Sequence, residues 1–362
     1  MTVQTMMATD PWRANLARRA EPVAIPLLAL LAGFAAFSLF LLTQGRSPAA
    51  FFGYVWQAGF GSAFSIQNTL SRAAPLLLAA LCVALPARLG LVVIGGEGAI
   101  VLGGVTAGAL AGAVSGAPPV LAIPVMALGA MIVGAVWIGA AGALRHFRGV
   151  NETISSLLLA YIAIALMNHL VEGPLRDPAS LNKPSTAPLP EALRVGNLPG
   201  MEVHWGLALG VLACLLSWVL IDRTTWGFAA RIAGANVRAA QVQGLPVGRL
   251  ILGFTALAGA FAGLAGFFEV AAVHGAANAS LASGYGYTGI LIAFLAMHNP
   301  AAIIPVAILL AGFEASSGLV QRRMDLPDAT VLVLQGFVFV AILLSDTLHG
   351  RFRIFAPDRW GR

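Results

Sequence analysis

Residues 119–143 read PVLAIPVMALGAMIVGAVWIGAAGA, a run of 25 residues without a charged side chain. An α-helix needs about 20 apolar residues to cross the hydrocarbon core of a bilayer, so this stretch predicts a transmembrane helix. The whole chain has the same character, because 59% of its 362 residues are hydrophobic and only 10% are charged. Soluble domains carry about 25% charged residues. The sequence therefore predicts an integral membrane protein.

Hydrophobic runs on both sides of this stretch predict an all-α, polytopic transmembrane bundle of about ten spans, occupying 23–346. The aromatic, half-polar stretch 50–67 suits the membrane interface. The glycine clusters in 90–114 and 274–298 predict broken or re-entrant helices, which require surrounding protein or a wet cavity. The predicted spans are 23–43, 72–87, 90–114, 119–143, 153–171, 205–221, 250–273, 285–298, 300–320 and 329–346.

The basic residues predict the orientation of these spans. With the amino terminus inside, 14 of the 21 Arg and Lys residues fall on the cytoplasmic side and 7 outside, as the positive-inside rule requires. The N-terminal segment 1–22 and the C-terminal tail 347–362 are then both cytoplasmic. The Pro-rich loop 173–204, too polar to cross, is extracytoplasmic, and 222–250 is cytoplasmic. The run 23–43 lacks a small-residue cleavage pattern, which favours a span over a signal peptide.

Two glycine motifs predict a pseudo-repeat of two halves. Residues 95–100 read GGEGAI and residues 284–290 read GYGYTGI, and each opens a glycine- and alanine-rich helix. Transporters are often built from such repeats, with interrupted hydrophobic segments near the substrate path.

Three carboxylates fall inside hydrophobic segments, where a charge costs about 2.5–3.5 kcal/mol at the helix centre. Glu97 lies between glycines, where a helix can break and the carboxylate can meet free backbone N–H groups. It either holds that bend or acts directly in substrate passage or gating. For Glu269 and Glu314 a structural role is favoured.

The predicted cytoplasmic segment 222–250 contains a short helix of small residues. Asn236 is placed to cap its first turn, and Gly244 can end it in a left-handed conformation. The small residues Ala239 and Ala240 suit docking into a groove on another protein. The alternative is an ordinary interfacial linker helix.

This segment resembles a known family. The pattern Gly234-x-Asn236-x-x-Ala239-Ala240-x-x-x-Gly244, followed by LAGAFAGLAG at 257–266, is similar to the inner-membrane permeases of ABC importers for sugars, nucleosides and branched-chain amino acids. GGEG at 95–98 agrees with it. The stretches NETISSLLLAYIA at 151–163 and GYGYTGI at 284–290 are typical of the nucleoside and simple-sugar branch, from which Ala160 departs because that branch has Asn there.

The resemblance implies a machine in the bacterial inner membrane. Such a permease pairs with itself or a similar subunit, and it works with two cytoplasmic ATPase subunits and an extracytoplasmic solute-binding protein. The resemblance assigns coupling to the ATPase to a set of residues in the short helix and its ends. That set is Gly234, Asn236, Ala239, Ala240 and Gly244.

A nucleoside or related small polar solute is the expected cargo. A purine nucleoside would be bound by aromatic stacking and amide hydrogen bonds, and four residues in the spans offer these groups, alongside Glu97. They are Tyr161, Asn168, Tyr285 and Tyr287. A simple sugar and a branched-chain amino acid are the alternatives.

The chain lacks the residues for ATP hydrolysis of its own. A P-loop needs a lysine on the phosphates, and the single lysine, Lys183, lies in the Pro-rich loop. ATP and Mg²⁺ are therefore expected in the partner ATPase, and no cofactor, catalytic residue or metal site is predicted in this chain. Two other classes remain as rivals: a secondary transporter driven by an ion gradient through the intramembrane carboxylates, and a membrane enzyme acting on lipid. The dispersed arginines do not indicate nucleic-acid binding.

Overall fold

The computed structural model describes residues 11–346, so segment 1–10 and the tail 347–362 lie outside the described residues. Those described are helical apart from loops and two isolated β-bridges, which confirms the all-α prediction. The α-helices are α1 (Pro11–Thr43), α2 (Pro48–Phe60), α3 (Ala63–Ala87), α4 (Gly96–Ala113), α5 (Pro119–Arg148), α6 (Glu152–Glu172), α7 (Gly206–Arg223), α8 (Thr225–Ala235), α9 (Val237–Val242), α10 (Val247–Phe268), α11 (Tyr285–Leu295), α12 (Pro300–Met324) and α13 (Thr330–Asp346). Three short elements complete the set: 3₁₀ helices at Glu191–Leu193 (η1) and Ala279–Leu281 (η3), and a π-helix at Glu269–His274 (η2).

Seven helical segments of the described chain are long and apolar enough to cross a bilayer, and one of them, Val247–His274, consists of α10 together with η2. The count rises to eight if Leu27–Thr43 and Pro48–Phe60, which meet at 119°, form one broken span. Two shorter apolar helical segments, 279–295 and 330–345, lie at the positions of two further predicted spans. The chain is therefore a multi-pass membrane protein.

Several predicted boundaries shift. The helix of the first span begins at Pro11, twelve residues before the predicted 23. The stretch 50–67, predicted as one interfacial segment, belongs to two helices, because the chain turns at Gly61 and Ser62. The Ser62 hydroxyl caps α3 by accepting from the Ser65 N–H at 3.0 Å, so that span starts at Ala63 rather than at residue 72.

The described residues fall into two compact units, one up to Tyr54 and from Ser317 onward, the other Val55–Ser316. In the first unit, α1 packs along α13. A Cβ on Gly33 would lie 2.8 Å from the Cα of Val338, so the two backbones approach closely. The ring of Phe37 lies 5.0 Å from that of Phe51 and 6.2 Å from that of Phe337, and these aromatic contacts join α1 to α2 and to α13.

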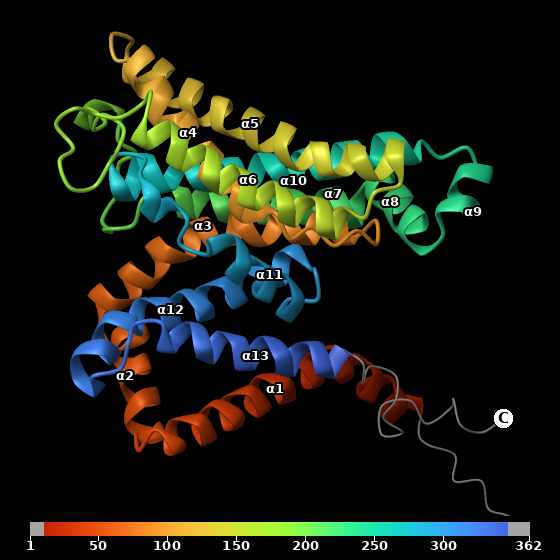
Figure 1. Cartoon of the computed structure of the whole chain (residues 1–362). Coiled ribbons are helices and arrows are strands. Elements are labelled where there is room, and N and C mark those ends of the chain that lie inside the picture. Colours follow the sequence, from red (N-terminus) through yellow and green to blue (C-terminus); the bar gives the residue numbers. More distant parts are fainter. Residues whose placement is uncertain (1–10, 347–362) are drawn as a thin grey trace, which may run out of the picture. The chain divides into compact units, whose positions relative to one another are not determined.

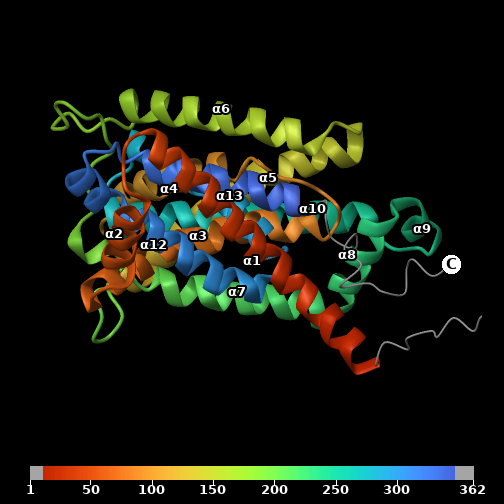
Figure 2. The ribbon, with the colours of Figure 1, turned by 90° about the horizontal axis from the view of Figure 1, so that it is seen from below.

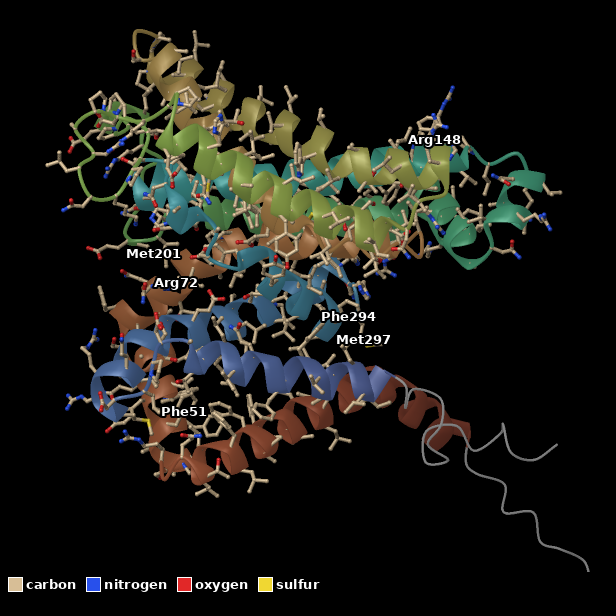
Figure 3. All side chains as sticks on the ribbon, in the orientation of Figure 1. Phe51, Arg72, Arg148, Met201, Phe294 and Met297 are labelled. Atoms are coloured by element: carbon tan, nitrogen blue, oxygen red, sulfur yellow. The ribbon has the colours of Figure 1, made fainter. Side chains whose placement is uncertain are left out.

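In the second unit, α3, α4, α5, α6, α7 and α10 form a helical bundle (Figures 1 and 2). Helices α8 and α9 protrude at one end of it, and the loop 173–204 lies at the opposite end. Figure 3 places Arg148 at the α8–α9 end, with Arg72 and Met201 at the loop end. This separation agrees with segments predicted to face opposite sides of the membrane, while the side that each end faces stays a prediction.

Glycines set the spacing at the centre of this bundle, where α10 packs most extensively against α5. A Cβ on Gly259 would clash with the carbonyl oxygen of Gly134, and one on Gly263 would clash with that of Ala130. Small residues allow membrane helices this close approach. On α4, a Cβ at Gly104 would meet Leu281, whereas nothing lies within 4 Å of Gly112. Gly104 of α4 is therefore packed against a neighbour, whereas Gly112 is not.

We predict that Gly259→Ala destabilises the protein by about 1–3 kcal/mol, the usual cost of overpacking. The matched control is Gly253→Ala on the same helix, where nothing lies within 4 Å of the added Cβ and Ala is the better helix former. Thermal unfolding in detergent measures both. Equal melting temperatures for the two variants would contradict the packing account.

Candidate functional site

The chain breaks after α10, as the glycine cluster at 274–298 predicts. The π-helix η2 ends at Gly275, whose φ is +70°, and η3 follows after a short irregular stretch. A second left-handed glycine, Gly284 at φ +89°, then precedes α11. Irregular backbone at membrane depth is tolerated only where the protein satisfies its polar groups. The partners of this segment therefore define the site.

Glu97 supplies two of those partners. Its Oε1 accepts from the Gly284 N–H at 2.7 Å, and its Oε2 accepts from the Gly286 N–H at 2.6 Å. The side chain is buried at 1% exposure and meets the positive end of the α11 dipole. A Cβ on Gly286 would clash with the backbone nitrogen of Glu97, so glycine is needed for this approach. The two motifs predicted as repeats therefore touch, and the hydrogen bonds favour the bend-holding role of Glu97.

The other two intramembrane carboxylates also have partners. Glu269 is 1% exposed, and its Oε2 lies 3.4 Å from His274 Nε2 within η2. Glu314 accepts from the Thr288 hydroxyl of α11 at 3.1 Å. These contacts fit the structural role expected for both residues.

The predicted path tyrosines gather near the start of α11. Tyr287 is 41% exposed, and the Glu97 carboxylate and the Tyr161 hydroxyl lie in the neighbourhood of its own hydroxyl. Tyr285 is half-buried, with Glu97 among its charged neighbours. Asn168 follows Tyr161 by seven residues and so lies on the same face of α6. The structure thus brings Glu97, Tyr161, Tyr285 and Tyr287 together.

An extended stretch, 91–94, leads into α4, which begins six residues after the predicted start of that span. The start of α6 holds this stretch by three side-chain hydrogen bonds, which we call the α6 latch. Val92 N–H donates to Glu152 Oε1 at 3.3 Å, the Thr153 hydroxyl donates to Val92 O at 2.9 Å, and Ile94 N–H donates to Ser156 Oγ at 3.1 Å. Glu152 also pairs with Arg145 at 3.3 Å.

The segment between α7 and α10 folds as two short helices with a break at Asn236. The Asn236 side chain accepts from the Ala239 N–H at 3.0 Å, and Gly244 has φ +77°. The predicted cap and left-handed ending are therefore confirmed. Ala239 is exposed, but Ala240 is buried at 0%. Ala240 therefore packs α9 against its own chain and is not accessible for the predicted docking.

Gly234, at the end of α8, packs on the chain after α3. A Cβ there would clash with Arg88 O and lie 3.0 Å from the carbonyl carbon of Leu89. Asp222 and Arg231 form an ion pair at 3.1 Å beside Arg88. Burial lowers the pKa of Arg88, and Asp222 opposes that shift. The guanidinium remains charged at neutral pH because its unperturbed pKa is above about 12.

At the other end of the bundle, the loop 173–204 pairs with the broken segment. Thr186 N–H donates to Ala277 O at 2.9 Å, and Leu189 N–H donates to Gly275 O at 2.8 Å. Val195 N–H donates to Ala271 O at 2.9 Å within η2. The loop therefore satisfies backbone groups that the π-helix and its ending leave open.

A scan against family models matches residues 65–343 to the permease component of branched-chain amino acid transport systems. The chain belongs to this permease family. The glucose ABC transporter permease protein TsgB13 of Haloferax volcanii is 32% identical, over 93% of this chain and 91% of that protein. The guanosine ABC transporter permease protein NupP of Bacillus subtilis is 28% identical, over 92% and 97%. The nucleoside ABC transporter permease protein NupB of Lactococcus lactis is 23% identical, over 89% and 91%. Their names identify transport subunits, and this permease is likewise not an enzyme.

The permease has functional groups that the sequence did not indicate. The α6 latch lies within the stretch 151–163, which resembles the family, but nothing in that pattern shows that its side chains bind an extended backbone. Val237 and Val242 are 47% and 84% exposed on α9. A six-residue helix is too short for hydrophobic periodicity to predict which of its residues are exposed. Among residues 11–346, no group of three or more His, Cys, Asp or Glu side chains could hold a metal ion.

The surroundings of His204, just before α7, predict that the stability of the permease depends on pH. Its Nδ1 accepts from the Gly206 N–H at 3.1 Å and its Nε2 donates to Ser71 O at 3.2 Å, so the neutral ring fits the site. Burial lowers the pKa of His204, whereas the hydrogen bond to Ser71 and the charge of Glu269 act to raise it. Protonation thus favours the unfolded chain, and stability falls as pH drops below about 6.5.

We predict that the melting temperature in detergent falls between pH 7.5 and pH 5 by more in the parent than in His204→Gln. The glutamine stays neutral over this range, while every other titrating group is shared by the two proteins. Parallel pH profiles for the parent and the variant would contradict the role given to His204.

Proposed function

We propose that this chain forms the translocation path of a bacterial ABC importer for a nucleoside or related small polar solute, powered by ATP and Mg²⁺ in separate ATPase subunits. The observation that carries the proposal is the capped, partly exposed helix α9, which protrudes from one end of the bundle of a family permease. A short protruding helix with an apolar exposed face suits insertion into a groove of a partner.

The proposed complex has an ATPase on the α9 side and a solute-binding protein on the side of loop 173–204. Both termini are then cytoplasmic, the membrane is the bacterial inner membrane, and a second permease subunit, identical or similar, completes the path. The placement of Arg148 and Arg72 at opposite ends supports this orientation, because the arginine count favours the Arg148 side as cytoplasmic.

The docking surface that we propose on α9 consists of Val237, Ala239 and Val242, which are exposed. Asn236 and Gly244 fix the two ends of the helix, and Ala240 seats it. A few well-packed residues near the centre of an interface carry most of its binding energy, so a charge placed among these small apolar residues would disrupt docking.

We predict that Ala239→Arg and Val242→Arg each weaken binding of the ATPase subunits on the order of tenfold or more, because each places a charge in the apolar contact. The control is Leu181→Arg, also an exposed apolar residue at 82%, in the loop at the other end. Affinity is measured in detergent without the binding protein. Unchanged affinity in both α9 variants would count against α9 as the docking element.

Nucleosides are the preferred cargo because tyrosines surround the start of α11. Tyr161 and Tyr287 are 59% and 41% exposed, so their rings are accessible for stacking on a base. Two of the relatives described above are named for guanosine and nucleosides. A simple sugar is the second candidate, since the relative at 32% identity is named for glucose.

Proteoliposomes containing the permease, its ATPase and its binding protein test the function. We predict ATP-dependent uptake of radiolabelled guanosine that persists when an uncoupler dissipates ion gradients. Saturable uptake of glucose, with none of guanosine, would select the sugar alternative. Uptake that needs no ATP and stops with the uncoupler would show a secondary transporter instead.

A further inference from the structure

The short helix α11 is held at its N-terminal end by one segment, residues 88–97. Glu97 accepts from the N–H groups of Gly284 and Gly286, as described above. These are groups that a helix start leaves without an intrahelical acceptor. The carboxylate therefore ties the start of α11 to the start of α4.

The same segment holds the other end of α11. The helix ends at Leu295, and the next turn brings the backbone oxygen of His298 to 3.0 Å from Nη2 of Arg88. A cation suits this end because the helix dipole is negative there. Arg88 and Glu97 thus place opposite charges at the two ends of one helix.

The lengths of the two elements match. Eleven residues of α11 rise about 16 Å at about 1.5 Å per residue. A chain segment advances at most about 3.3 Å per residue, so the non-helical stretch 91–94 and the turn at Gly95 can cover a similar distance. The segment can therefore bracket α11 from Arg88 to Glu97.

Residues 88–97, which we call the bracket, are attached to the start of α6. The α6 latch fixes its middle through Glu152, Thr153 and Ser156. A Cβ on Gly95 would clash with the Ser156 carbonyl oxygen, so the backbones are in direct contact there. Because the segment is held at its middle and has little freedom to stretch, it would tilt about the start of α6, so that a shift at Arg88 would move Glu97 and α11 relative to α6.

The cytoplasmic-segment helix α8 contacts the bracket at its Arg88 end. Gly234 packs on the carbonyl groups of Arg88 and Leu89, and a Cβ on Gly90 would lie 3.3 Å from Gly234 O. The ion pair of Asp222 and Arg231 adds charges beside the Arg88 guanidinium. Helix α9, the proposed ATPase contact, follows α8 directly.

We propose that Arg88 and Glu97 are positioning residues that hold α11 by both ends, so that movement of α8 and α9 displaces α11 and its tyrosines. This inference rests on the proposed function. It assigns to residues 88–97 the mechanical link between the ATPase contact and the residues expected to meet the solute.

Distance measurements between spin labels test the link. The background is Cys82→Ala with Cys214→Ala, which removes both buried cysteines. One label pair joins α6 to α11 at positions 158 and 287, which are 56% and 41% exposed. A control pair joins α6 to α7 at positions 158 and 219. A single label at 241, an exposed position of α9 outside the proposed docking surface, reports binding of the ATPase to α9.

In the parent complex we expect trapping with ATP and vanadate to shift the 158–287 distance but not the 158–219 distance. In Arg88→Gln and Glu97→Gln that shift falls to less than half, while the label at 241 still becomes immobilised by the ATPase. Arg88→Lys, which keeps the charge and a donor, restores most of the shift, as a general loss of folding would not allow.

Three outcomes overturn the link. A parent complex whose 241 label responds while the 158–287 distance stays fixed refutes the inference and leaves the proposed function intact. A full shift retained in both Arg88→Gln and Glu97→Gln also refutes it. A 241 label that never responds to the ATPase removes the proposed function, and the inference with it.

Discussion

A carboxylate buried among membrane helices needs hydrogen-bond donors, and a helix that starts at membrane depth needs acceptors. Glu97 and the N–H groups of Gly284 and Gly286 meet both needs at once. The cost of placing either one in lipid without the other is several kcal/mol. This mutual dependence allows the chain to break at 275–284 inside a bundle whose other helices are long and apolar.

The rest of the bundle supports that contact from several sides. Glycines of α5 and α10 bring the central backbones into close contact. At one end, loop 173–204 satisfies the π-helix and the residues after it. At the other, α8 packs on the turn that leads into 91–94. The break gives the bundle a short helix, α11, that an unbroken span would not provide.

The sequence shows the all-α membrane fold clearly, because composition and hydrophobic run length need no knowledge of contacts. It also indicates where the backbone breaks, since GGEG and GYGYTGI are unsuited to regular membrane helices. It could not show that these two motifs meet. The hydrogen bond from Gly284 to Glu97 joins residues 187 positions apart, and no local pattern encodes such a pairing. For the same reason the sequence could not show the α6 latch or the hydrogen bond from Arg88 to the His298 carbonyl oxygen.

Local patterns were more informative at Asn236 and Gly244, where capping and a left-handed ending depend on neighbouring residues only. They failed at Ala240, because the face that a six-residue helix buries is set by the chain beneath it. They also overestimated the stretch 285–298 as a span. Its apolar composition is that of a membrane helix, but Leu295 ends it after eleven residues, which is too short to cross.

Amide hydrogen exchange of the detergent-solubilised permease, parent against Glu97→Gln, tests most directly whether this carboxylate holds α11. The account predicts that amides at 284–289 lose protection in the variant, since one acceptor oxygen is replaced by an NH₂ group, while α5 and α10 keep theirs. Protection at 284–289 that is the same in both proteins would contradict it.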